Sequence, residues 1–159
     1  MTKSNSVFYW LPCSVVFIST AHGGRQDIMT ATAMFVSEKE PLVAVSVACG
    51  HLTDQLIEKS GEFALAIAAP PQIKLANQLG SLRGEAVDKI ERLSVPLLAT
   101  REGKPSVPAG SAAWMLCRVE KSQEISEYRL IVGRVTAQDD LGPPPLVWQR
   151  GDYFSLTPL

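Results

Sequence analysis

Apolar residues occur mainly in short runs separated by polar or Gly- and Pro-containing segments. The run at residues 14–20 is rich in β-branched side chains and predicts a buried strand. At residues 62–67, large apolar side chains alternate with alanines, which places Phe63, Leu65 and Ile67 on one face of a strand. The predicted strands are residues 14–20, 42–47, 62–67, 112–123, 127–138 and 146–148. This pattern indicates a mainly β chain.

Two short segments predict helices. In the first, residues 53–59, Thr53 can cap the start, Asp54 suits the positive N-terminal end and Gly61 is a stop signal. The second, residues 71–79, has a proline in its first turn. Because strands are not regularly interleaved with long helices, a doubly wound parallel sheet is not expected.

Glycine and proline mark the connections. Residues 22–25 contain two adjacent glycines and predict a turn. Residues 101–110 predict an exposed loop, and residues 142–145 a stiff connector. Strand-forming segments occur in both halves of the chain. This distribution favours one barrel domain, residues 1–159, over two domains.

Composition narrows the classes of function. Hydrophobic residues make up 46% of the 159-residue chain and charged residues 19%, which suits one globular domain. The net charge of -1, without a basic block, gives no electrostatic footprint for nucleic acid. No apolar run reaches about 18 residues, so we expect no membrane-spanning helix and no membrane partner.

The cysteines and histidines do not form a recognisable catalytic or metal motif. Cys13, Cys49 and Cys117 are far apart and include no CxxC pair, so we interpret them as small, buried, reduced side chains of a cytoplasmic protein. His22 and His51 are the only histidines, and P-loop, GxGxxG and GxSxG motifs are absent. A bound cofactor would supply chemistry that these side chains do not.

One ordered set of segments carries a family resemblance. Met29-Thr30-Ala31-Thr32 follows a glycine and a short polar stretch, and a Pro-Leu-Val strand comes next. Thr53 is then followed by Leu-Ile and by Ser-Gly-Glu-Phe. The matching segments are residues 24–37, 41–47, 51–63, 88–89, 130–135 and 145–153. Over about residues 10–156 the chain resembles the flavin reductase-like family of FMN-binding split barrels.

The resemblance implies a fold and an activity. The fold would be mainly β with short helices, an FMN-binding split β-barrel of Greek-key type that works as a homodimer. The activity would be that of an FMN-dependent oxidoreductase, in which NADH or NADPH gives a hydride to flavin N5. Electrons would then pass to another flavin, to oxygen or to a redox partner protein.

The residue types after the first strand suit a flat ring. Small residues such as Ala31, Ala33 and Ala48 let the backbone approach the ring closely. Backbone N–H groups at residues 30–32 could donate hydrogen bonds to the ring's oxygens and N5. By resemblance, Asp27 contacts the ribityl chain or the flavin edge.

A second group suits a phosphate. By resemblance, Ser46, His51 and Thr53 belong to the phosphate and ribityl end, where a helix start offers N–H donors. Lys89 or Arg83 would add positive charge. The implied cofactor-binding residues are Asp27, Met29, Thr30, Ala31, Thr32, Ser46, Val47, Ala48, His51, Thr53 and Lys89. The resemblance implies no metal ligand and no catalytic side chain.

Several of these residues also have purely structural interpretations. Thr53 would cap a helix without any ligand, and Asp27 could be a turn residue. His51 could lie in an exposed loop, and Lys89 could be solvated or paired with a surface carboxylate.

The larger apolar residues have similar alternatives. Met29 and Met34 could fill the core. Trp148 and Tyr153 could pack in the barrel or dimer core rather than against a nicotinamide.

Three positions depart from the family pattern. Tyr128 and Gln149 stand where many members have histidine, which leaves the use of NADH or NADPH open. Ala66 stands where many members have asparagine, near the flavin pocket. Two rival functions therefore remain: a flavoredoxin-like FMN electron carrier, and a flavin-free split barrel that acts as a binding module.

Overall fold

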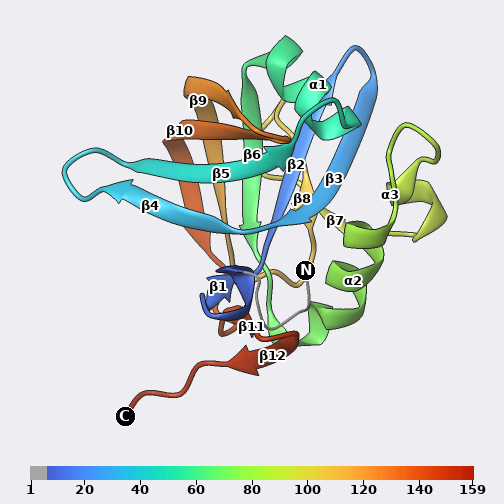
Figure 1. Cartoon of the computed structure of the whole chain (residues 1–159). Helices are drawn as coiled ribbons and strands as arrows, with labels where there is room; N and C mark the ends of the chain where they lie inside the picture. The colour runs from blue at the N-terminus through green and yellow to red at the C-terminus, as the bar shows by residue number, and fades with distance from the viewer. Residues whose placement is uncertain (1–6) are drawn as a thin grey trace.

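The main sheet has seven antiparallel strands in the order β3-β2-β6-β9-β10-β5-β4 (Figure 1). The computed structural model describes residues 7–159, and residues 1–6 of the expected domain lie outside it. The strands are β2 Val16–His22, β3 Arg25–Ala31, β4 Ala33–Ser37, β5 Leu42–Ala48, β6 Glu62–Ile67, β9 Ala113–Ile125 and β10 Tyr128–Asp140. The prediction of a mainly β chain is confirmed.

Two smaller sheets complete the β structure. β1 Cys13–Ser14, β11 Leu146–Gln149 and β12 Asp152–Ser155 lie together below the main sheet in Figure 1. β7 Leu97–Leu98 pairs with β8 Val107–Pro108. The predicted exposed loop at residues 101–110 is therefore partly wrong, because Val107 and Pro108 are buried while residues 101–104 are exposed. Pairing with β7 draws the second part of this segment into the core.

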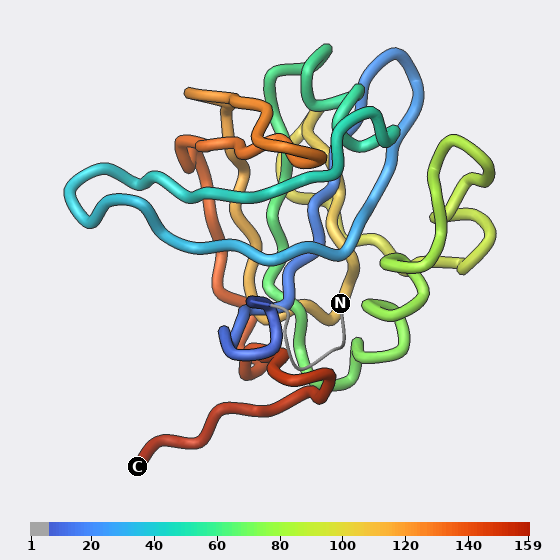
Figure 2. Tube along the Cα trace, viewed as in Figure 1, coloured from blue at the N-terminus to red at the C-terminus, as the bar shows by residue number. Residues whose placement is uncertain are grey.

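The two outer strands of the main sheet are consecutive in the chain. Thr32 alone separates β3 from β4. The β4–β5 hairpin projects away from the rest of the molecule (Figure 2). On it, Met34 and Phe35 are each 67% exposed. The interpretation of Met34 as a core residue is therefore wrong.

Three helices cover parts of the sheet: α1 Leu52–Ser60, α2 Ile73–Ser81 and α3 Lys89–Arg92. Short 3-10 turns lie at Val7–Tyr9 and, before α2, at Pro70–Gln72. α1 ends as predicted at Gly61, whose φ of 71° is left-handed and whose N–H donates to the Ile57 carbonyl. Its N-cap is His51, without a side-chain hydrogen bond, so the predicted capping role of Thr53 is wrong. Thr53 lies inside the helix, so its hydroxyl is available for a hydrogen bond outside the helix.

The core has two clusters, one on each face of β2. Phe17 packs in the first cluster, which α2 covers through Ala76 and Leu79. Ile18 points the other way into the second cluster, as successive side chains of a strand must. Burial on both faces explains why residues 16–20 are all buried.

The cysteines fit their predicted role only in part. Cys117 is buried in the second cluster, and burial raises its pKa to about 12, so the thiol stays protonated. Cys13 and Cys49 are only half-buried, and all three cysteines are free.

Gly133 of β10 makes room for an aromatic ring. A Cβ atom there would lie 2.8 Å from Cζ of Phe63 and 3.0 Å from Cβ of Cys117. Since both neighbours are buried in the second cluster, only glycine lets the ring of Phe63 lie against β10.

Candidate functional site

A cavity of about 770 Å³ lies where β3 and β5 meet α1, α2 and the segment before α3. All the predicted binding residues except Val47 line it. They are Asp27, Met29, Thr30, Ala31, Thr32, Ser46, Ala48, His51, Thr53 and Lys89. The side chain of Val47 is fully buried in the second core cluster, because it points to the opposite face of β5 from Ser46 and Ala48.

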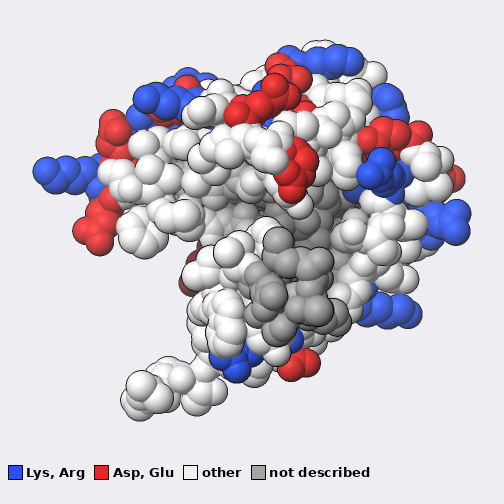
Figure 3. Space-filling model, in the orientation of Figure 1, with Lys and Arg blue, Asp and Glu red and all other residues white. Residues whose placement is uncertain are grey.

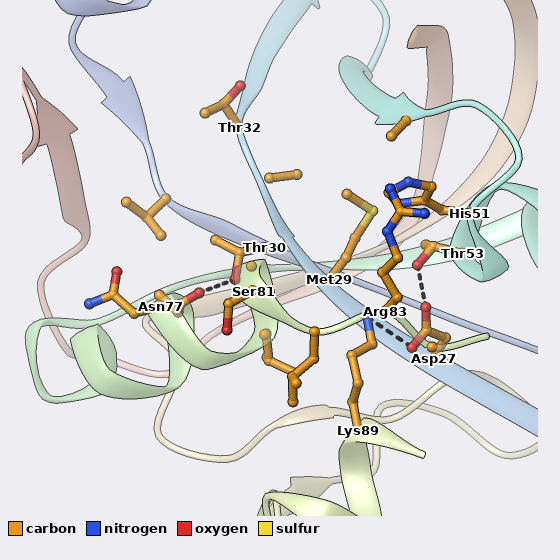
Figure 4. A pocket seen from close by; sticks show the side chains of 18 of the residues that line it. Asp27, Met29, Thr30, Thr32, His51, Thr53, Asn77, Ser81, Arg83 and Lys89 are labelled. Carbon is orange, nitrogen blue, oxygen red and sulfur yellow. Dashed lines mark hydrogen bonds and ion pairs between the residues drawn. The ribbon is translucent and has the colours of Figure 1, made fainter. Parts of the chain in front are cut away.

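Asp27 is the centre of a buried polar cluster on the cavity wall. Its Oδ1 lies 3.0 Å from Nζ of Lys89, and both side chains are 3% exposed. Its Oδ2 accepts a hydrogen bond of 2.6 Å from the Thr53 hydroxyl (Figure 4). The cluster therefore ties β3 to the first residue of α3 and to the first turn of α1.

Two structural interpretations from the sequence are wrong here. Asp27 is buried within a strand and is not a turn residue. Lys89 is neither solvated nor paired at the surface, because its partner is Asp27, 62 positions away in the sequence (89 minus 27).

Gly84 also lies against the Asp27 carboxylate, in addition to Lys89 and Thr53. A Cβ atom at this position would lie 2.7 to 2.9 Å from the carboxyl atoms of Asp27. The backbone of the segment between α2 and α3 can lie against the carboxylate only because residue 84 has no side chain.

Arg83 is a second cation at this end of the cavity. It is exposed, lines the cavity and extends toward His51 in Figure 4. Within residues 7–159 it forms no salt bridge, in contrast to Lys89. Arg83 is therefore the cation available to a bound anion.

The turn that carries His51 is anchored from the side of the sheet. Asp54 Oδ2 accepts from the backbone N–H of Gly50 at 2.8 Å, and Asp54 Oδ1 accepts from Nε of Arg129 at 2.6 Å. Gly50 has a φ of 78°, which is left-handed and favours glycine. His51 is half-buried at the cavity wall, so the interpretation as an exposed loop residue is wrong.

The opposite end of the cavity is neutral and partly aromatic. Tyr153 donates a hydrogen bond of 2.6 Å to Oδ1 of Asn77, and Thr30 donates one of 2.6 Å to the Ala76 carbonyl. Burial raises the pKa of the Tyr153 phenol. Trp148 and Tyr153 pack against the first core cluster, which agrees with their structural interpretation, and both also line the cavity. Their packing against a nicotinamide stays a prediction.

Some lining residues were not predicted from the sequence. Asn77, Gly80 and Ser81 of α2 line the cavity and are three and four positions apart, which places them on one helix face. This polar spacing within a helix was a usable signal. Tyr128, noted only as a departure from the pattern, also lines the cavity.

Other types of site find no support in the described part of the chain. Within residues 7–159 no group of three His, Cys, Asp or Glu residues is placed to hold a metal ion. Over the same range, no helix has the length and apolar character needed to cross a bilayer.

The family model described as "Flavin reductase like domain" matches residues 8–157. The chain belongs to this family. A flavin reductase-like relative from Rhizobium meliloti, named "Probable flavin reductase", is 28% identical over 147 residues, which cover 89% of this chain and 44% of that protein. An "Uncharacterized protein" of Archaeoglobus fulgidus is 30% identical over 70% of this chain and 63% of its own length. This chain therefore spans less than two thirds of these two relatives.

Other flavin reductase-like proteins are matched over more of their length. "NADH:riboflavin 5'-phosphate oxidoreductase" of Streptomyces pristinaespiralis is 24% identical over 92% of this chain and 82% of that protein. The solved structure of "Flavin reductase PheA2 in native state" has a TM-score of 0.78 at 25% identity, over 93% and 92% of the two chains. Flavoredoxin from Methanosarcina acetivorans has a TM-score of 0.85 at 19% identity, over 98% and 90%, which shows the shared fold.

Proposed function

We propose that this chain binds a flavin in the cavity beside β3 and works as a flavin-dependent oxidoreductase. The observation that carries the proposal is that residues of the family-matched segments, far apart in the sequence, converge on one cavity of about 770 Å³. That volume lies within the usual range for small-molecule sites.

The lining residues fit a flat ring with a phosphorylated tail. Ala31 and Ala48 give small walls, and Thr32 and Ser46 add hydroxyls that take part in no side-chain hydrogen bond within residues 7–159. Arg83 adds a free cation at the end where His51 lies. We propose FMN as the flavin, with its phosphate at this charged end.

The protein's own part in the reaction is to bind and orient. A bound flavin would supply the two-electron chemistry that the lining side chains lack. Thr32 and Ser46 would donate hydrogen bonds to its polar edge, and the aromatic residues of the neutral end would exclude water. Thr30 has already committed its proton to the Ala76 carbonyl, so it could only accept from a ligand.

We propose NADH or NADPH as the electron donor; the name of the Streptomyces pristinaespiralis relative specifies NADH. In the test, the protein and FMN are mixed with each nucleotide under anaerobic conditions, and the reaction is measured as the loss of flavin absorbance. Bleaching of the flavin band by either nucleotide supports the reductase. No bleaching by either nucleotide contradicts it.

One observation favours an electron carrier instead. Gln149, which stands where many members have histidine, has no titratable proton and donates its amide to the Trp10 carbonyl at 3.1 Å. A flavoredoxin-like carrier would need no nicotinamide site. Protein that retains flavin through purification and accepts electrons only from a protein donor would support this alternative.

A homodimeric split barrel is the assembly we propose. The β4–β5 hairpin exposes Met34, Phe35 and Val36, and Leu130 lies exposed on β10. A second copy would bury these apolar side chains. On the face drawn in Figure 3, the charged side chains gather mainly over the upper part of the molecule. Sedimentation of a dimer at micromolar concentration supports the assembly, and a monomer alone contradicts it.

A further inference from the structure

The positive charge of Lys89 is already neutralised within the flavin cavity. Its ammonium lies 3.0 Å from Asp27, and neither side chain is more than 3% exposed. A buried ion pair is seldom a net source of stability, because the desolvation of both charges offsets their attraction. A pair placed on the wall of a ligand cavity therefore calls for a reason other than stability.

The ion pair reduces the positive charge that the cavity offers to a bound anion. Without Asp27, the charged end would present two cations, Lys89 and Arg83. With it, the carboxylate neutralises Lys89 and also repels an incoming phosphate, so Arg83 alone carries free positive charge. Thr53, another candidate donor, is likewise committed to Asp27.

We propose that Asp27 is a specificity-determining residue that weakens the preference of this site for phosphorylated over non-phosphorylated flavin. Its carboxylate competes with the phosphate for Lys89 and Thr53, and Arg83 is the cation that binds the phosphate. This inference rests on the proposed flavin-binding function and concerns the same cavity.

Riboflavin and FMN isolate the effect, because they share the ring and the ribityl chain and differ only in the phosphate. Their dissociation constants are measured by quenching of flavin fluorescence, and the riboflavin constant divided by the FMN constant gives the phosphate preference. Asp27→Asn is expected to raise this ratio about tenfold, since Lys89 would then make a charge-assisted bond to the phosphate. Asp27→Asn combined with Lys89→Gln is expected to return it to near the wild-type value.

Arg83→Gln provides the opposite change without disturbing the buried pair. Because Arg83 is exposed and forms no salt bridge within residues 7–159, this variant should fold normally even if Asp27→Asn does not. The ratio is expected to fall about tenfold. Arg92→Gln is the matched control, since Arg92 is exposed on α3 and does not line the cavity.

The outcomes separate this inference from the function on which it rests. If the wild-type protein quenches neither flavin, both are overturned. If it binds flavin and Asp27→Asn leaves the ratio unchanged or lowers it, only the inference is overturned. A ratio unaffected by Arg83→Gln overturns it as well. Equal weakening of both flavins by Asp27→Asn would instead assign Asp27 to the ribityl chain.

Discussion

The two ends of the cavity are held together by different kinds of bond. At one end Asp27, Lys89 and Thr53 form a buried cluster with a full charge on each side of an ion pair. At the other end Tyr153 and Asn77 form a neutral hydrogen bond of similar length to the bond between Thr53 and Asp27. The two ends therefore differ in energy although the distances are similar, because a buried charge that loses its partner destabilises the fold far more than a neutral group that loses one.

The sharpest way to break the charged end is Lys89→Met. This change leaves the Asp27 carboxylate buried without a counter-ion, and it should lower the free energy of unfolding by about 3–5 kcal/mol. Urea denaturation measures the loss. Lys104→Met is the matched control: its partner Glu62 lies 2.7 Å away, but the two side chains are 43% and 31% exposed. There the loss should stay below about 1 kcal/mol, and equal losses in the two variants would contradict the comparison.

A smaller effect is expected from a single added methyl group. Gly84→Ala would place Cβ against the Asp27 carboxylate, and the resulting overpacking should cost about 1–3 kcal/mol. The backbone of Gly84 is not left-handed, so the obstacle is steric.

Gly80→Ala in α2 serves as the control for this prediction. Its Cβ would meet Thr30 no closer than 3.8 Å, and alanine is the better helix former. Thermal unfolding should show a small gain in stability at residue 80 and a loss at residue 84. A gain in stability at both positions would show that the segment before α3 can shift to accommodate the added methyl group, and it would contradict the prediction for residue 84.

The neutral end should respond least. Tyr153→Phe removes the hydrogen bond to Asn77 and should cost about 0.5–1.5 kcal/mol. Since burial raises the pKa of Tyr153, the folded state holds the phenol proton more tightly than the unfolded state. This contribution is complete at neutral pH and is lost as the pH rises above about 10. The variant should lack this part of the alkaline loss of stability.

Tyr9→Phe is the control, because the Tyr9 hydroxyl takes part in no side-chain hydrogen bond within residues 7–159. Denaturation at pH 7 and pH 11 compares the two. An unchanged alkaline decline in Tyr153→Phe would contradict the role assigned to the phenol.

Local pattern predicted five of the seven strands of the main sheet, but not β3 and β4, which form the segment between two of the predicted strands. The strand at residues 62–67 and the helix ending before Gly61 follow from alternation and from a glycine stop, both of which act over a few residues. The segment at residues 101–110 was misjudged, because the burial of Val107 depends on pairing with β7 and not on its own composition.

The site was predicted only as far as the family motifs reach. They brought together the residues of β3, β5 and α1 that line the cavity. They could not show that Lys89 and Asp27 pair, because a contact between residues 62 positions apart depends on how α3 packs against β3. The hydroxyl of Thr53 was misassigned for the same reason: a helix start suggests a cap, and only tertiary structure supplies the competing acceptor.

The close approach of Gly133 and Phe63 bears on how mutational data for this chain should be interpreted. A saturation library would show position 133 to be as intolerant as a binding residue, although it does not line the cavity. Sorting variants by abundance as well as by FMN binding would separate the two: changes at residue 133 would deplete the protein itself, whereas changes at Arg83 would leave the protein abundant and, on the proposal above, weaken its binding of FMN.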